Sequence, residues 1–349
     1  MSFEFYPNDV SDLKVPNVQS FLDFIESCNK KSNFNVGIYG SASSCKTTLC
    51  NFLIDYFVKE QIKKCDGCIN PSKDEIRQIK SKILYVFEND DDLNINNIQS
   101  HINIFCKRNI KYDKMIYIEN FDDFSESNQQ QLKLYMDHFH LLKTKNKTHF
   151  IIEVNESHKV RDIIETRIRI FETIPLNKSC LVNISNDICA RNNIYIDEDV
   201  LHYLLQIGNV NIKNMINIFK KAWLLDKKVI DKDSMQCISY LIDFNDFDQF
   251  MDLLQNAQYF EGCKVLNKFY VDGYDVSDIL YFFYQYCKIK CEAEETKLSS
   301  TVYYDIINIL CCYINEIYKG LQHHIILNYL AYDIYKIVHE INDYHTLVI

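Results

Sequence analysis

Apolar strand-like runs alternate with helical segments through the first half of this 349-residue chain, and this alternation restricts the possible folds most strongly. Each run is almost continuously apolar, which is typical of strands covered on both faces of a parallel sheet. The predicted strands are 35–39, 83–88, 115–120 and 150–155, and the predicted helices between them include 49–57, 95–105 and 129–139. The sequence therefore predicts an α/β fold with a parallel sheet.

The pattern changes after Pro175, because helical spacing dominates from about residue 180 and no series of strands returns. A second junction is predicted at 244–247. We therefore divide the chain into an α/β domain at 1–175 and two helical domains at 176–243 and 244–349.

Composition excludes several classes of protein. Apolar residues make up 47% of the chain, but no apolar run reaches the length that spans a membrane. The N-terminal residues lack a secretory signal, so we expect an intracellular protein whose 14 cysteines are reduced thiols. The formal net charge of −10 argues against binding nucleic acid with the whole surface but allows a local basic strip. We attribute the abundant Tyr, Phe, Ile, Asn and Lys to an A/T-rich genome.

A phosphate-binding loop is predicted where the first strand runs into a helix. The template is Gly, four residues, Gly, Lys and Ser/Thr; Gly40, Lys46 and Thr47 match it, and Cys45 replaces the second glycine. Such a loop directs backbone N–H groups at phosphates, while the ammonium reaches the same oxygens and the hydroxyl binds Mg²⁺. The alternative is a Ser-rich loop without this function. The predicted nucleotide-binding residues are Gly40, Ser41, Ala42, Ser43, Ser44, Cys45, Lys46, Thr47 and Thr48.

An acidic residue at the end of a neighbouring strand is also needed, because it helps to hold Mg²⁺. Glu119 ends such a strand, and we predict that it is a catalytic residue that holds the metal together with Thr47. Many ATPases carry a catalytic Glu at the next position, where this chain has Asn120. An amide cannot accept a proton from attacking water, so slow or absent hydrolysis is predicted. The alternative is a polar strand end without a metal. ATP and Mg²⁺ are the predicted cofactors.

The order of these motifs resembles that of the small subunits of replication factor C, the AAA+ clamp loaders. The resemblance runs from Phe5 to about Tyr286. Residues 40–47 resemble the family's Gly-Pro-Pro-Gly-Thr-Gly-Lys-Thr, and residues 119–122 stand at its Asp-Glu-Ala-Asp box. Phe5-Tyr6-Pro7 is similar to the family's Tyr-Arg-Pro near the adenine pocket, which implies that Pro7 contacts the nucleotide.

The same resemblance implies roles for three residues further along the chain. Asn155 is similar to the polar sensor that positions the attacking water near the γ-phosphate. Arg167 is similar to the arginine of the Ser-Arg-Cys segment, an arginine finger that reaches the neighbouring subunit's nucleotide. Lys213 stands at the second sensor arginine, where a lysine offers a point charge instead of a bidentate fork.

The resemblance implies an AAA+ nucleotide-binding core at 1–175, a helical lid at 176–243 and a helical collar at 244–349 through which subunits join. It implies an ATPase-type chain with altered Walker A and Walker B motifs in a hetero-pentameric clamp loader. Such an assembly uses ATP to open a sliding clamp and place it on primer–template DNA, without sequence preference. A nuclear or cytoplasmic replication site is implied.

Two other interpretations remain open. One is a structural clamp-loader subunit with a dead nucleotide pocket, which Cys45, Asn120 and Lys213 favour. Such a subunit supplies an arginine finger and collar contacts only. The other is a stand-alone P-loop enzyme, although the sequence offers no evident acceptor-binding or translocation residues.

Three further motifs are predicted to have structural roles only. Cys65 and Cys68 have zinc-knuckle spacing, but no second pair of ligands follows, so no zinc site is predicted. The acidic run at 88–92 is read as a loop and a helix N-terminus. Cys311 and Cys312 are expected in the core of an apolar helix.

Overall fold

The computed structural model describes residues 5–7, 13–30, 34–67, 71–87, 95–141, 147–206, 212–231, 242–292 and 298–339. Residues 4–185 form one compact unit, and residues 186–349 belong to a second. The predicted domain boundaries at 175 and 243 stay predictions. No helix in the described ranges combines the length and the apolar character needed to cross a membrane.

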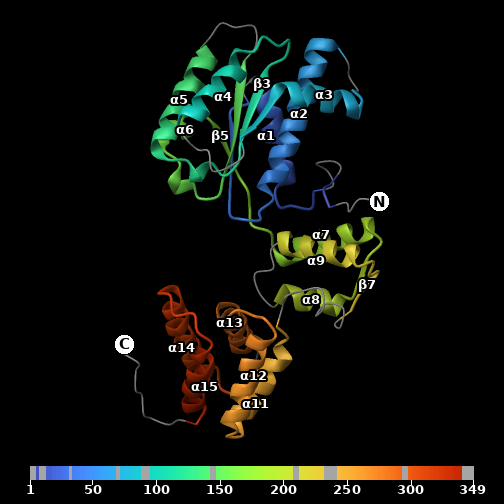
Figure 1. Ribbon diagram of the computed structural model, residues 1–349. Coiled ribbons are helices and arrows are strands. Elements are labelled where there is room, and N and C mark those ends of the chain that lie inside the picture. The colour runs from blue at the N-terminus through green and yellow to red at the C-terminus, as the bar shows by residue number, and fades with distance from the viewer. Residues whose placement is uncertain are drawn as a thin grey trace. The chain divides into compact units, whose positions relative to one another are not determined.

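The first unit is built on a five-stranded parallel sheet with the strand order β2-β3-β4-β1-β5 (Figure 1). The fold class predicted from the alternation of apolar runs and helices is confirmed. The edge strand β5 was not predicted, because its side chains alternate between half-buried and exposed instead of forming an apolar run. The strands are β1 Val36–Tyr39, β2 Leu84–Phe87, β3 Lys114–Ile118, β4 Thr148–Val154 and β5 Arg169–Glu172.

Helices cover both faces of this sheet (Figure 1). The side chains of β3 alternate accordingly: Met115 and Tyr117 pack on one face, and Ile116 and Ile118 pack on the other. The helix α3 was not predicted, although a capping box between Ser72 and Glu75 marks its start. One face carries α1 Val18–Lys30, α2 Lys46–Asp66 and α3 Lys73–Ile83; the other carries α4 Ile95–Lys107, α5 Glu126–Leu141 and α6 Asp162–Glu165.

The parallel register brings the carboxyl ends of β1, β3 and β4 to one edge of the sheet. Ile38 is paired with Glu153 across β1 and β4, and Ile118 is paired with Ile152 across β3 and β4. Ligands of open parallel sheets bind outside this edge. The loop after β1, Glu119 after β3 and Asn155 after β4 therefore face a common region.

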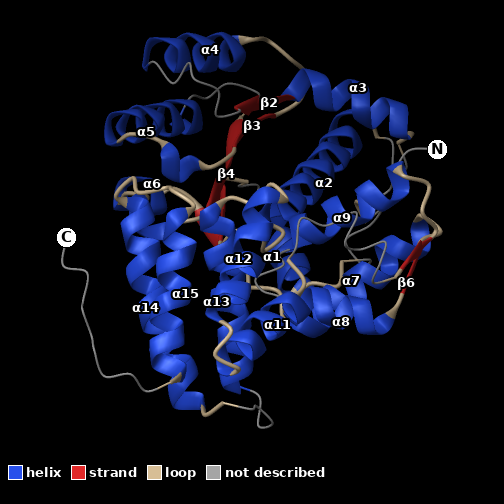
Figure 2. Cartoon of the chain, turned by 60° about the horizontal axis from the view of Figure 1, so that its bottom comes forward, coloured by secondary structure: helices blue, strands red, loops and turns tan. Residues whose placement is uncertain are grey.

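The described part of the second unit is helical apart from a two-stranded parallel sheet (Figure 2). Its last five described helices share one core that is rich in aromatic side chains, including Phe247, Phe250 and Phe283. The elements are α7 Lys178–Arg191, which begins in the first unit, β6 Tyr195–Ile196, α8 Glu198–Gln206, α9 Ile212–Leu224, β7 Val229–Ile230, α11 Phe244–Gln255, α12 Tyr259–Val271, α13 Val276–Glu292, α14 Ser300–Tyr318 and α15 Ile325–Val338.

The expectation that Cys311 and Cys312 are core residues is wrong. Both thiols are exposed on α14. The buried positions of this helix include Ile306, Leu310 and Ile317, whose spacing defines one face, and residues 311 and 312 follow on the outer side.

Candidate nucleotide-binding site

The loop after β1 contains left-handed backbone conformations that glycine usually adopts, although only its first residue is glycine. Ser43 and Cys45 both have φ of 63°, in the left-handed region, and Cys45 caps α2 with ψ of 21°. This conformation costs a non-glycine residue about 1–2 kcal/mol. Ser43 and Cys45 stand where the motif that this loop resembles has glycine. Both residues nevertheless keep the left-handed conformation that glycine adopts readily.

Gly40 cannot be replaced without moving its neighbours. Its φ is 154°, and a Cβ atom there would lie 1.9 Å from the Thr173 hydroxyl oxygen. That hydroxyl lies 2.6 Å from Ser44 Oγ, and it donates to the Tyr39 carbonyl at 3.0 Å. Thr173 thus joins the end of β1 to the loop in the space that the missing side chain leaves.

The Lys46 ammonium lies inside the loop. Lys46 is 3% exposed, and its Nζ donates to the Ser41 carbonyl at 2.7 Å. The Ser44 hydroxyl donates to the same carbonyl at 2.8 Å. Lys46 is also the first residue of α2, and a helix N-terminus favours an anion through its N–H groups and its dipole. A phosphate bound here would take over the ammonium from the Ser41 carbonyl.

The Thr47 hydroxyl points at a carboxylate that the sequence analysis did not single out. Thr47 Oγ1 donates to Glu153 Oε1 at 3.0 Å, and the Tyr117 hydroxyl donates to Glu153 Oε2 at 2.7 Å. Glu153 is 6% exposed. The available signal was an acid inside the apolar run of β4, where an unpaired charge is costly. Burial, with Cys50 and Glu153 nearby, raises the pKa of Tyr117 far above its usual value, so it stays a hydrogen-bond donor.

Asn120 and Asn155 meet at the same edge of the sheet. Asn155 Nδ2 donates to Asn120 Oδ1 at 3.1 Å, and the Asn155 backbone N–H donates to Asp122 Oδ1 at 3.0 Å. Asn120 has a left-handed backbone with φ of 45° at the start of the 3₁₀ turn Phe121–Asp123. Glu119 is half-buried, and its N–H continues the ladder to the Phe87 carbonyl at 3.3 Å. At the position where many ATPases carry a catalytic Glu, this chain therefore has an amide, Asn120, which is hydrogen-bonded to a second amide, Asn155.

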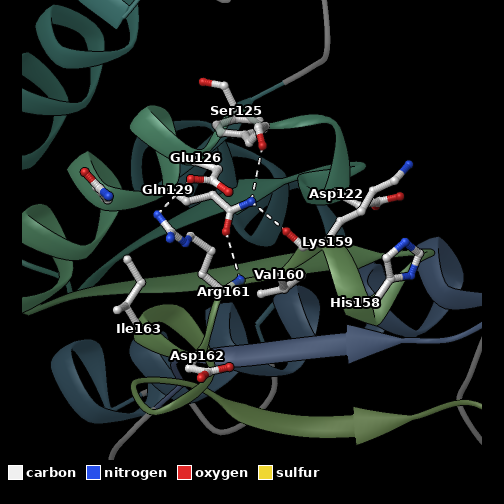
Figure 3. A pocket seen from close by; sticks show the side chains of 12 residues that line it. Asp122, Ser125, Glu126, Gln129, His158, Lys159, Val160, Arg161, Asp162 and Ile163 are labelled. Carbon is white, nitrogen blue, oxygen red and sulfur yellow. Dashed lines mark hydrogen bonds and ion pairs between the residues drawn. The ribbon is translucent and has the colours of Figure 1, made fainter.

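A cleft of about 740 Å³ opens beside the segment that follows Asn155 (Figure 3). Gln129, only 1% exposed, lies at its centre and holds the segment to α5. Its Nε2 donates to the carbonyls of Phe124 at 3.2 Å and Lys159 at 3.0 Å, and its Oε1 accepts from the Arg161 N–H at 3.0 Å. At the rim of the cleft, Arg161 forms an ion pair with Glu126 at 3.1 Å.

The predicted finger Arg167 lies against α5 of its own chain. Its Nε and Nη2 donate to the two oxygens of Asp137 at 2.7 and 2.9 Å, and Nη1 donates to the Ile163 carbonyl at 2.7 Å. The side chains of Arg167 and Asp137 are 27% and 40% exposed. The guanidinium is therefore oriented by a bidentate pair at the surface.

The nucleotide contacts predicted for Pro7 and Lys213 stay predictions. A hollow of about 10 Å³ borders Ser44, and it is lined by residues 15–18 and Ile174 among others, but not by Pro7. That volume is about the size of one water. Lys213 is exposed on α9 in the second unit, and the preceding residues 207–211 lie outside the described residues.

The discounted metal motifs are only partly covered by the structure. Cys68 and the run 88–92 lie outside the described residues. Within the described part of the chain, no group of three or more His, Cys, Asp or Glu side chains is arranged to hold a metal ion. A nucleotide-bound Mg²⁺ does not require such a group, because phosphates and waters supply most of its ligands.

No family model matches the chain. Curated relatives match at low identity and are replication factor C small subunits. The Haloquadratum walsbyi protein is 26% identical over 151 residues, 43% of this chain and 22% of that protein. The Pyrococcus furiosus protein is 28% identical over 120 residues, 34% of this chain and 14% of that protein. The Methanosphaera stadtmanae protein is 22% identical over 193 residues, 50% of this chain and 58% of that protein. The chain thus spans less than two thirds of each relative.

Solved structures resemble the chain only weakly. A mutant of Thermotoga maritima RuvB has a TM-score of 0.47 at 11% identity, covering 71% of this chain and 79% of that one. The Bacillus subtilis DNA clamp loader delta protein has a TM-score of 0.40 at 11% identity, covering 90% of this chain and 99% of that one. These similarities are too weak to assign a function.

The parallel sheet, the loop before α2 and the helical second unit agree with the architecture predicted from the sequence, an α/β domain followed by helices. Over part of its length, the sequence is similar at low identity to replication factor C small subunits, the family that the order of its motifs resembles.

Replacing Ser43 with glycine tests the strain in the loop. Glycine adopts the left-handed conformation freely, so we expect Ser43→Gly to raise the free energy of unfolding by about 1 kcal/mol. Urea denaturation measures the change. The control is Ser41→Gly, at a loop residue without positive φ, which we expect to lower the free energy of unfolding by up to about 1 kcal/mol. Equal changes in the two variants would contradict the strain.

The Cys45 thiol is expected to react slowly with alkylating reagents. Burial raises its pKa to about 11, more than the Lys46 ammonium lowers it. Because the thiolate is the reactive form, labelling by iodoacetamide without nucleotide or magnesium should rise about tenfold per pH unit from pH 8 to 10. Mass spectrometry of the peptides measures this rate, with the exposed Cys311 and Cys312 as references. If Cys45 were labelled as fast as these two cysteines at pH 8, its thiol would not be buried with a raised pKa.

Proposed function

We propose that the chain is a subunit of a heteromeric sliding-clamp loader that acts in DNA replication and binds ATP in the loop after β1. The observation that carries this proposal is the loop itself, whose left-handed turns at Ser43 and Cys45 deliver Lys46 and Thr47 to the start of α2. The similarity to replication factor C small subunits supports the clamp-loader role.

The residues of the first unit fit a nucleotide with Mg²⁺. Lys46 would exchange the Ser41 carbonyl for phosphate oxygens, and the N-terminal N–H groups of α2 would donate to the same phosphate group. Thr47 and Glu119 would hold the metal, which neutralises charge on the phosphates. Residues 41–45 and Thr48 complete the loop.

Hydrolysis at this site is proposed to be weak. Asn155 would position water, but its amide is hydrogen-bonded to Asn120, and neither amide accepts a proton at neutral pH. A general base typically contributes about 10²–10⁴-fold to the rate. The site would then act mainly as a switch, in which bound nucleotide favours one arrangement of the subunits.

Arg167 is proposed to serve the nucleotide of a neighbouring subunit. Its two-pronged pairing with Asp137 has the geometry with which arginine also binds a phosphate. Engagement of a neighbour would therefore exchange one bidentate partner for another. The surrounding assembly would be a hetero-pentamer that contacts a sliding clamp and primer–template DNA, inside the cell at a nuclear or cytoplasmic replication site. The net charge of −10 argues against DNA binding by the whole surface. Local basic groups would therefore bind the DNA through its phosphates.

A second candidate function is a structural subunit with a dead pocket. The buried Lys46, whose ammonium donates to the Ser41 carbonyl, and the amide at 120 favour it. Lys213 and Pro7 would then have no nucleotide to contact. Titration of the full chain with fluorescent ATP separates the two candidates, because only the first predicts saturable binding.

Lys46→Ala is expected to abolish nucleotide binding, since it removes the ammonium that reaches the phosphates. The titration is a fluorescence measurement on the full chain with Mg²⁺ present. The control is Lys59→Ala, which removes an exposed lysine from the same helix and should leave the affinity within about twofold. Unchanged affinity in Lys46→Ala would place the nucleotide elsewhere.

Arg167→Ala is expected to lower ATP turnover of the reconstituted complex by about 10³-fold at the neighbour's site, the scale of an arginine finger. Steady-state phosphate release measures the turnover. Arg161→Ala, six residues earlier and paired at the surface with Glu126, serves as the control and should keep turnover within about twofold. Normal turnover of the Arg167 variant would remove the finger role.

A further inference from the structure

Glu153 is a buried carboxylate whose hydrogen bonds come from neutral groups. Its two oxygens accept from the hydroxyls of Thr47 at 3.0 Å and Tyr117 at 2.7 Å. Among the described residues, no lysine or arginine forms an ion pair with it. A buried carboxylate without a cation is costly to keep ionised. The surroundings of Glu153 therefore favour a cation close to its oxygens.

The register of the sheet places Glu153 beside the second acid of the site. Ile118 and Ile152 are paired across β3 and β4, so Glu119 and Glu153 follow at equivalent positions. Tyr117 packs with the α2 face, and both acids stand on that side by the alternation of strand side chains. Burial raises the pKa of Cys50 on α2, and the charges of Glu153 and Glu119 raise it further, which agrees with two carboxylates facing this helix.

The hydrogen bond that Thr47 donates to Glu153 also fixes how the Thr47 hydroxyl is oriented. A hydroxyl has one proton and two acceptor lone pairs. Because the proton of Thr47 is donated to Glu153, the lone pairs are left for another ligand at the start of α2. A hard cation that prefers oxygen ligands, such as Mg²⁺, suits this position.

We propose that Glu153 is the positioning residue of the metal site, orienting the Thr47 hydroxyl toward Mg²⁺ and adding a second carboxylate beside Glu119. The inference rests on the proposed nucleotide site and deepens it. It assigns the contact with Thr47 to an acid near the carboxyl end of β4, in addition to Glu119 at the end of β3. It also gives the chain a way to keep magnesium dependence although the acid at the end of β3 is a glutamate followed by an amide.

The test is the magnesium dependence of ATP binding, measured by fluorescent ATP titration of the full chain in Mg²⁺ and in EDTA. Glu153→Gln keeps the size of the side chain and an acceptor for Thr47 but removes the charge. We expect the ratio of ATP affinity in Mg²⁺ to ATP affinity in EDTA to fall at least about tenfold in this variant. Its affinity in EDTA should stay within about twofold of the wild-type value. Glu153→Asp, which keeps the charge, should recover part of the gain.

Two comparison variants accompany it. Glu172→Gln removes the same charge from an exposed position on β5 and should leave both affinities unchanged. Glu119→Gln reports the share of the other acid. Circular dichroism melting of each variant establishes that it is folded.

The outcomes separate the inference from the proposed function. Wild-type magnesium dependence in Glu153→Gln would overturn the inference, and so would an equal loss of affinity with and without Mg²⁺, which indicates a structural role. ATP binding by the wild type without any gain from Mg²⁺ would also overturn it and leave the nucleotide site standing. Absence of binding in both conditions would overturn the nucleotide site and this inference together.

Discussion

The parallel register of β1, β3 and β4 is the constraint on which the rest of the site depends. It aligns Ile38 with Glu153 and Ile118 with Ile152, so the polar residues after each strand reach one edge. A slip by one residue would turn every side chain of β4 to the opposite face. Glu153 would then enter the apolar layer under α4 and α5, and Ile152 would face Thr47 in its place. The continuous apolar packing on both faces opposes that slip.

The helix α5 organises the segment between the end of β4 and Arg167. Gln129 near its start holds the backbone of Lys159 and Arg161, and Asp137 two turns later holds the Arg167 side chain. Eight residues of α-helix span about 12 Å. A rigid helix therefore sets the distance between two points of this segment, so the site at the edge of the sheet and the surface arginine share one support.

Much of the fold was predictable because it follows from local pattern. Four strands are nearly continuous apolar runs, and the loop before α2 carries Gly40, Lys46 and Thr47 at a recognisable spacing. The strand β5 was missed because an edge strand buries only alternate side chains. Within the site, Glu153 was missed because its role depends on Thr47, which lies 106 positions earlier and meets it only in the folded sheet. The pairing of Arg167 with Asp137 is likewise tertiary, and no spacing rule announces it.

The left-handed turns at Ser43 and Cys45 have a consequence for how such loops are found and how they behave. Side chains at these positions narrow the torsional freedom of the unfolded segment more than glycine would. Less entropy is then surrendered when an anion orders the loop, although the folded form stores torsional energy. A phosphate-binding loop is thus defined by its backbone dihedral angles. Sequence searches that require glycine at these positions will miss chains in which other residues adopt the same angles.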